Sequence, residues 1–107
     1  MTTLIENRKA RFNYEILERF EAGIKLQGHE VKAVKAGHGL FDGAYITVRG
    51  GEAYVVNLSI PPYQQNNTPK DYDPRHMRKL LLKKKELSYL AAQEEQAGLT
   101  IVPLLMY

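Results

Sequence analysis

Hydrophobic and polar residues alternate in two short stretches near the middle of the chain. These stretches, 44–48 (AYITV) and 53–58 (AYVVNL), flank the tetrapeptide 49–52, which has Gly-Gly at its centre. β-Branched and aromatic residues on both sides of two glycines are typical of strands joined by a tight turn. We therefore predict a β-hairpin here, and it is the clearest local signal in the sequence.

Two other segments show helical spacing. The segment 28–37 has a glycine at each end, and Val31 and Val34 are three residues apart, so they share one helix face. In the segment 84–96, apolar residues recur at the i, i+3, i+4 spacing of an amphipathic helix. The pattern predicts a short helix and a longer one.

The remaining chain predicts strands and one loop. Residues 20–26 alternate well enough for a strand, and the apolar run 78–83 fits a buried strand as well as the start of a helix. The segment 99–106 is typical of a strand in which Pro103 indicates an edge or a bulge. Four of the five prolines fall in 59–74, which predicts a long irregular loop.

This order of elements indicates a mainly β fold with flanking α-helices. A small antiparallel barrel like the oligonucleotide-binding (OB) fold accommodates it, and a split β-sheet with helices on one face is the alternative. We expect a flexible basic arm at residues 1–11 and one domain at residues 12–107. The residues expected in the core are Ile16, Phe20, Ile24, Leu26, Val31, Tyr45, Tyr54 and Leu80–Leu82.

Composition narrows the function classes. The chain has no cysteine, which excludes disulfides and cysteine-ligated zinc, and no apolar run reaches the roughly 18 residues of a membrane span. Its net charge is +3, and the basic residues cluster. Such clusters attract nucleic-acid phosphates, although a solvated face is an equally good interpretation from clustering alone. The clusters are Arg8, Lys9 and Arg11 near the N-terminus, and Arg75, Arg78, Lys79 and Lys83–Lys85.

No arrangement of residues indicates catalysis. Asp71, Asp73 and His76 could be imagined as metal ligands, but they lie in the proline-rich loop, where nothing preorganises them. Neither serine lies in a GxSxG elbow, and the glycines form no phosphate-binding loop. We therefore expect no enzyme activity, metal or cofactor. Among the aromatic residues, Tyr63 is the best surface candidate for stacking on a base.

Several motifs in order resemble the small protein B family, the bacterial proteins that bind transfer-messenger RNA (tmRNA). The resemblance covers nearly the whole chain, and five such motifs with similar spacing are far more specific than any one of them. The matching segments are 7–11 (NRKAR), 14–16 (YEI), 21–24 (EAGI), 28–37 (GHEVKAVKAG), the hairpin 45–57, 60–63 (IPPY) and 73–82 with its DP and RKLLL elements.

The resemblance implies an OB-like RNA-binding domain that grips the tRNA-like domain of tmRNA and delivers it to stalled 70S ribosomes in trans-translation. It implies a cytoplasmic monomer without catalytic activity, small-molecule substrate, cofactor, metal or membrane. The family pattern continues past the position of Tyr107 with another strand and a basic tail, so we expect the barrel to be incomplete in this chain. With Tyr63 added, the expected RNA-binding residues are Asn7, Arg8, Lys9, Arg11, Gly28, Glu30, Val31, Lys32, Lys35, Tyr63, Arg78, Lys79 and Lys83.

The chain also departs from the family pattern. Ala33 stands in place of the usual serine, and Lys35 replaces an arginine, which keeps the charge but loses the bidentate fork. The alternative functions are a generic OB-fold protein that binds single-stranded nucleic acid and, less favoured, an enzyme acting on RNA.

Glu30 is an acidic residue among lysines, and its role has three interpretations. It could pair with a basic residue such as Lys35 or one in the arm, accept hydrogen bonds from RNA bases or ribose hydroxyls, or be an ordinary solvated helix residue. The resemblance favours the second. On that hypothesis, Glu30→Gln weakens RNA binding and leaves the melting temperature nearly unchanged.

Overall fold

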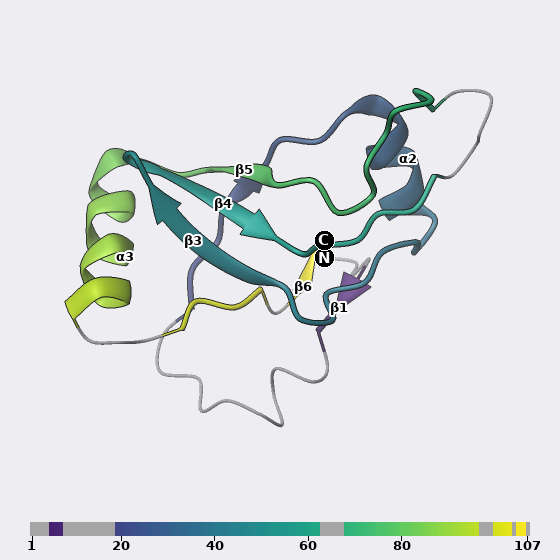
Figure 1. The fold of residues 1–107 in the computed structure, drawn as a ribbon. Helices are drawn as coiled ribbons and strands as arrows, with labels where there is room; N and C mark the ends of the chain where they lie inside the picture. Colours follow the sequence, from purple (N-terminus) through teal and green to yellow (C-terminus); the bar gives the residue numbers. More distant parts are fainter. Residues whose placement is uncertain (1–4, 8–18, 63–67, 97–99, 104, 107) are drawn as a thin grey trace.

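The fold of the 107-residue chain was analysed in a computed structural model that describes residues 5–7, 19–62, 68–96, 100–103 and 105–106 (Figure 1). Strands and helices alternate irregularly along the chain, with most strands in one sheet. The elements are β1 (Ile5–Glu6), β2 (Gly23–Ile24), α2 (Gly28–Lys35), β3 (Tyr45–Arg49), β4 (Glu52–Val56), β5 (Arg78–Leu81), α3 (Lys84–Gln96) and β6 (Leu105–Met106).

The main sheet is antiparallel and has the strand order β2-β5-β4-β3. The predicted hairpin is confirmed as β3–β4, with Arg49 opposite Glu52 at the turn. Gly50 and Gly51 have φ values of 58° and 78°, the left-handed conformation that a primed two-residue turn requires and that glycine adopts without strain. The predicted strand at 78–83 is confirmed as β5, which pairs with β4.

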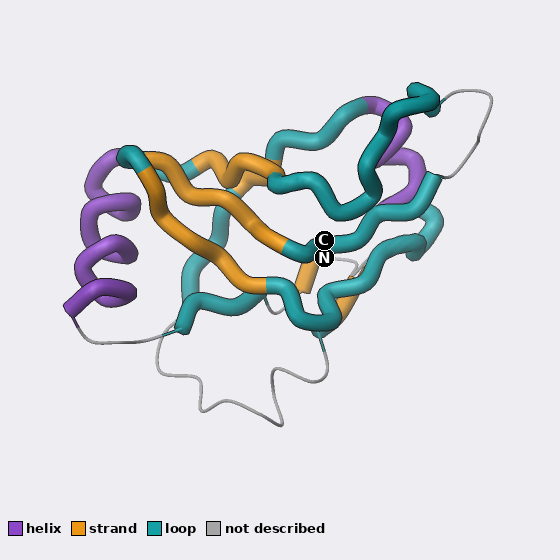
Figure 2. Tube along the Cα trace, in the orientation of Figure 1, coloured by secondary structure: helices purple, strands orange, loops and turns teal. Residues whose placement is uncertain are grey.

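Both predicted helices are confirmed, and they lie at opposite ends of this sheet (Figures 1 and 2). The core forms where they meet the inward-facing strand residues. From α2 come Ala33 and Val34, from α3 comes Leu87, and from the strands come residues such as Ile46 and Val55. The i, i+3, i+4 positions 30, 33 and 34 of α2 therefore form its buried face.

Four residues expected in the core are exposed: Phe20 (46%), Val31 (37%), Tyr45 (40%) and Leu81 (55%). Tyr45 and Leu81 lie on the outward face, because side chains alternate along a strand and their neighbours point inward. Val31 lies outside the helix face that positions 30, 33 and 34 bury.

The other core predictions had mixed outcomes. Ile24, Leu26, Leu80 and Leu82 pack against the core as expected. Tyr54 is half-buried on the outward face of β4, because it pairs with Lys79 while its neighbours Ala53 and Val55 point inward. The prediction for Ile16 lies outside the described residues.

The segments near the two ends of the chain pair with each other. Ile5 lies opposite Met106 in the β1–β6 pair, and the Asn7 side-chain amide donates a hydrogen bond to the Pro103 carbonyl at 2.8 Å. Three residues of the expected flexible arm are therefore part of the fold, and the rest of the arm lies outside the described residues.

The described strands form an open sheet and not a closed barrel. Ile101 forms an isolated bridge with Ile46, which adds one residue of the predicted 99–106 strand to the free edge of β3. The predicted strand at 20–26 is shortened to β2, a two-residue strand paired with β5. The coarser prediction, a mainly β fold with flanking helices, is confirmed.

Candidate nucleic-acid interface

Glu30 lies in the first turn of α2, and its side chain is completely buried. The sequence places it there because positions 30, 33 and 34 form the face of the helix that packs on the sheet. One carboxylate oxygen, Oε1, accepts a hydrogen bond from the backbone N–H of Gln27 at 2.9 Å. A carboxylate that reaches back to the residue before a helix satisfies a backbone donor that the helix leaves free. Glu30 therefore fixes the start of α2.

Arg78 is the cationic partner of Glu30, and it is 1% exposed. Its Nε and Nη2 atoms lie 2.7 and 2.6 Å from Oε2 of Glu30. The remaining donors of the guanidinium reach backbone carbonyls, at 2.6 Å to Leu58, 2.9 Å to Pro74 and 3.2 Å to His76. A single arginine thus joins α2, β5, the end of the hairpin and the proline-rich loop.

Tyr72 and His76 come from that loop and complete the cluster. The Tyr72 hydroxyl lies 2.6 Å from the Ile60 carbonyl and 3.0 Å from Oε2 of Glu30, and it accepts a hydrogen bond from Nη2 of Arg78 at 3.1 Å. Nε2 of His76 lies 2.9 Å from the same Oε2. The C-terminal part of the predicted loop is therefore held against α2 by side chains.

The electrostatics of the cluster favour a charged Glu30. Burial alone raises the pKa of this carboxyl group, because it disfavours the charged form. The hydrogen bond from Gln27, the hydrogen bond and charge of Arg78 and the hydrogen bond from His76 outweigh burial, so the pKa of Glu30 lies below its ordinary value. Burial and the neighbouring Glu30 carboxylate raise the pKa of Tyr72 to about 12.

The opposite face of α2 is open to solvent. Gly28, Val31, Lys32 and Lys35 are all exposed on it. No atom lies within 4 Å of the position a Cβ would occupy at Gly28, so the described residues leave the backbone accessible there. We define this set of four residues as the α2 surface. It is a small basic surface, and the buried face of the same helix is held by the cluster of Glu30, Arg78, Tyr72 and His76.

The remaining predicted residues are spread over the molecule. Lys79 is half-exposed on the outward face of β5, with its Nζ atom 3.3 Å from a carboxylate oxygen of Glu52, and Lys83 is exposed beyond β5. Asn7 is largely buried near Pro103. The predicted residues that lie outside the described part of the chain are Arg8, Lys9, Arg11 and Tyr63.

The structure corrects the interpretation of two predicted RNA contacts. Glu30 and Arg78 have buried side chains that bond to each other, so neither one lies on the described surface. The hypothesis of a solvated Glu30 is wrong, and so is its proposed pairing with Lys35. The pairing hypothesis is right in kind, but the basic partner lies 48 residues away along the chain.

Sequence reasoning missed the roles of Tyr72 and His76, which bond to Glu30. A signal was available in Arg78. In the predicted strand 78–83, alternation places it on the same face as Leu80 and Leu82, which were expected in the core. An arginine on the core face of a strand requires a buried acid and several acceptors. That requirement directs attention to Glu30 and to the polar side chains of the loop.

The described residues restrict the chemistry in two ways. No group of three His, Cys, Asp or Glu side chains among them could hold a metal ion. No helix in this part of the chain has the length and apolar character to cross a membrane. Within the same residues, every buried side-chain nitrogen or oxygen has a hydrogen-bond partner.

Comparison with known proteins identifies the family. The SmpB protein family matches residues 4–107. The chain belongs to the SmpB family. The SsrA-binding protein of Microcystis aeruginosa (strain NIES-843 / IAM M-2473) is 53% identical over 104 residues, which cover 97% of this chain and 68% of that protein. The SsrA-binding protein of Thermus thermophilus is 50% identical over 107 residues, which cover 100% of this chain and 74% of that protein.

A solved SmpB-family structure agrees in fold. It is described as "tmRNA-SmpB: a journey to the center of the bacterial ribosome", and one of its chains superposes on this chain with a TM-score of 0.78 and 49% sequence identity. The match covers 99% of this chain and 73% of the solved chain. The family resemblance inferred from the sequence motifs is therefore confirmed.

Proposed function

We propose that this chain binds the tRNA-like domain of tmRNA and delivers the RNA to stalled ribosomes for trans-translation. Membership of the SmpB family carries this proposal, because the relatives are SsrA-binding proteins and the similar solved structure concerns tmRNA and SmpB in the bacterial ribosome. The chain acts by binding and not by catalysis, in the cytoplasm, where ribosomes work. It needs no cofactor for this role.

The α2 surface is the best-positioned part of the RNA-binding surface. Lys32 and Lys35 project from one short helix, where they can neutralise phosphates, and the exposed backbone at Gly28 allows close approach of a ribose or phosphate. Folded RNA is contacted mainly through phosphates and 2′-hydroxyls. Lys79, Lys83 and the basic residues of the arm extend the positive charge available to such a partner.

The Glu30–Arg78 pair supports binding indirectly. It fixes the first turn of α2 to the sheet and to the loop, so the α2 surface is presented in one orientation. A rigid surface binds more tightly than a mobile one because less conformational freedom is lost on binding. We therefore assign Glu30 and Arg78 a positioning role and not direct RNA contact.

We further propose that the strands belong to an OB-like barrel. The Ile46–Ile101 bridge and the β1–β6 pair support this proposal, because they extend strand pairing beyond the open sheet at its β3 edge and near the two ends of the described chain. Slow hydrogen exchange at the Ile46 amide, comparable to that of the paired strands β3 and β4, would support a closed barrel, and exchange as fast as at an unpaired strand edge would contradict it.

A competition experiment tests RNA recognition. The chain should bind labelled tmRNA, and unlabelled tmRNA should displace it far better than an unstructured RNA of equal length at the same salt. Equal competition by the two RNAs would favour the alternative of a generic single-strand-binding protein. Cleavage of labelled tmRNA in the same mixture with magnesium would revive an enzymatic role.

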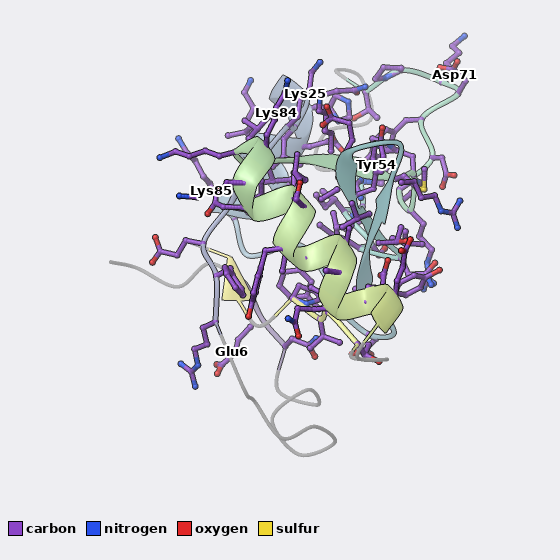
Figure 3. All side chains as sticks on the ribbon, turned by 90° about the vertical axis from the view of Figure 1, so that its left-hand side faces the viewer. Glu6, Lys25, Tyr54, Asp71, Lys84 and Lys85 are labelled. Atoms are coloured by element: carbon purple, nitrogen blue, oxygen red, sulfur yellow. The ribbon has the colours of Figure 1, made fainter. Side chains whose placement is uncertain are left out.

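Lysine substitutions test the surface. Lys32→Ala and Lys35→Ala should each weaken tmRNA binding and reduce the slope of log affinity against log salt by about 1. The matched controls are Lys84→Ala and Lys85→Ala, which remove exposed lysines at the start of α3 (Figure 3). Controls that lower the slope as much as the α2 variants would contradict the placement of the interface.

A further inference from the structure

The outward face of the main sheet carries a row of side chains that lies across three strands. Tyr54 of β4 stands between Thr47 of β3 and Lys79 of β5, because the strand register pairs it with both. Side chains alternate along a strand, and the neighbours of Tyr54 in the chain, Ala53 and Val55, belong to the core. Tyr54 therefore points to the side of the sheet that the core does not use.

Large apolar side chains remain exposed on this outward face. Tyr45 of β3 is 40% exposed, and it pairs with Val56, two positions after Tyr54. The two tyrosines are therefore diagonal neighbours on adjacent strands, about 7–8 Å apart, which is within reach of aromatic side chains. Met77 is 48% exposed and directly precedes the buried Arg78. Within the described residues, neither tyrosine side chain has a hydrogen bond or a ring contact.

The charged residues of this face favour an anionic partner. Arg49 and Lys79 are cationic, and Glu52 is the one acid among the outward-facing residues of the described strands β3, β4 and β5. Nζ of Lys79 lies 3.3 Å from a carboxylate oxygen of Glu52, and these side chains are 42% and 40% exposed. A pair that is this exposed is weak, so an incoming phosphate can compete with Glu52 for the lysine.

We propose that the outward face of β3, β4 and β5 binds unpaired RNA bases, which stack on Tyr54 and Tyr45 while Lys79 contacts the adjoining phosphate. An unpaired nucleotide presents a flat apolar base beside a negative charge, and an aromatic ring next to a cation is complementary to both. Aromatic side chains on a sheet face bind two or three successive bases in other RNA-binding folds. The exposed rings, their spacing and the net positive charge of the face carry the proposal.

This site is separate from the α2 surface and takes a different part of an RNA. The lysines of the α2 surface neutralise phosphates of a folded RNA, whereas the outward face of the sheet takes bases that are free of pairing partners. The step to tmRNA rests on the proposed function, since tmRNA would then supply both parts. Binding of bases by the sheet does not depend on which RNA provides them.

An NMR titration of the whole chain with a short oligoadenylate tests the site directly. Ring-proton signals of Tyr45 and Tyr54 should shift, because a stacked base shields the protons of the ring beneath it. Tyr89 of α3 is the matched control in the same spectra, since it is also 40% exposed. Short-chain polyphosphate supplies negative charge without bases and should leave the tyrosine signals in place. Equal shifts at Tyr89, or equal shifts with polyphosphate, would overturn the proposal.

Substitutions at Tyr54 measure the contribution of the ring. Tyr54→Val removes the ring and keeps a residue suited to a strand, whereas Tyr54→Phe keeps the ring. Oligoadenylate affinity should fall about fivefold or more in Tyr54→Val and stay within about twofold of wild type in Tyr54→Phe. Tyr45→Thr, at the more exposed position, should also weaken binding and provides the test if Tyr54→Val does not fold. Wild-type affinity in a folded Tyr54→Val or in Tyr45→Thr, or failure of wild type to bind oligoadenylate, would overturn the proposal and favour a protein partner for this face.

The two proposals fail separately. If the chain shows no preference for tmRNA but oligoadenylate binds through Tyr54, the proposed function is wrong and the base-binding site stands. If tmRNA binds selectively while Tyr54→Val binds oligoadenylate and tmRNA as tightly as wild type does, the proposed function stands and the present inference is overturned.

Discussion

Glu30→Gln should destabilise the protein strongly, contrary to what the hypothesis of a direct RNA contact expected. The substitution leaves Arg78 as a buried, uncompensated cation, and Oε2 of Glu30 is the only carboxylate oxygen within bonding distance of that guanidinium in the described residues. Removing one partner of a buried ion pair typically costs about 3–5 kcal/mol. A domain of this length has a total unfolding free energy of about 5–15 kcal/mol.

The expected change is easily measured by thermal denaturation followed by circular dichroism. At about 4 °C per kcal/mol for a domain near 100 residues, the melting temperature should fall by about 12 °C or more. Glu52→Gln is the matched control, since it also removes a glutamate from an ion pair, with Lys79, but both side chains there are about 40% exposed. Exposed ion pairs contribute about 0.2–1 kcal/mol, so the melting temperature of the control should fall by no more than about 4 °C.

Two further measurements separate the buried pair from other causes. The loss in Glu30→Gln should persist in about 1 M salt, because buried charges are screened less than exposed ones. The double variant Glu30→Gln/Arg78→Met should cost less than the sum of the two single variants, because it leaves no unpaired charge. If Glu30→Gln melts within a few degrees of Glu52→Gln, the carboxylate is not the essential partner of Arg78 and the argument fails.

Four further outcomes follow from the same cluster and from the hairpin. Folding lowers the pKa of Glu30, so the stability that this carboxylate contributes is present above its unfolded pKa and is lost as pH falls through the folded pKa. The urea midpoint should therefore drop more between neutral and acidic pH in wild type than in Glu30→Gln. The pKa of Tyr72 is raised from 10.0 to about 12, so ultraviolet difference absorbance should show one tyrosine that ionises at higher pH than the others, and this late ionisation should be absent in Tyr72→Phe. The stability contributed by neutral Tyr72 should be present below pH 10 and lost toward pH 12. Arg78→Lys should destabilise by at least about 1.5 kcal/mol in urea unfolding, because an ammonium group cannot reach the several acceptors that the planar fork serves, and full stability would refute the role of the fork. Gly51→Ala should destabilise by about 1 kcal/mol through its positive φ, whereas Gly28→Ala, with open space around it, should cost less.

Local patterns predicted the helices and the hairpin because their determinants are local. The i, i+3, i+4 spacing of Leu87, Leu90 and Ala91 and the Gly50-Gly51 pair each specify one element without help from distant residues. The strand expected over 20–26 was predicted too long, because the pairing that defines β2 depends on β5, more than 50 residues later in the chain. Sheet pairing is a non-local property that a single sequence does not display.

The candidate site shows the same limit more sharply. Glu30 and Arg78 were both selected from the family motifs, but as separate RNA contacts. Nothing in the spacing of 48 residues indicates that they meet, and a charged residue is expected on the surface unless it has a buried partner. The exposed positions of Lys32 and Lys35 were easier to predict, because a lysine needs no partner within the protein to lie on the surface.

The hydrogen bonds that join Ile60 to Tyr72 and Pro74 also govern how freely the chain can change in length. The two ends of the proline-rich segment are joined directly. The Ile60 N–H donates to the Pro74 carbonyl at 3.0 Å, and the Tyr72 hydroxyl donates to the Ile60 carbonyl. Doubling the length of a loop whose ends are joined raises the entropic cost of closing it by only about 0.6 kcal/mol. Residues can therefore be inserted between these two anchors in the course of evolution, or by an engineer who needs a site for a tag or label, at little cost to the domain.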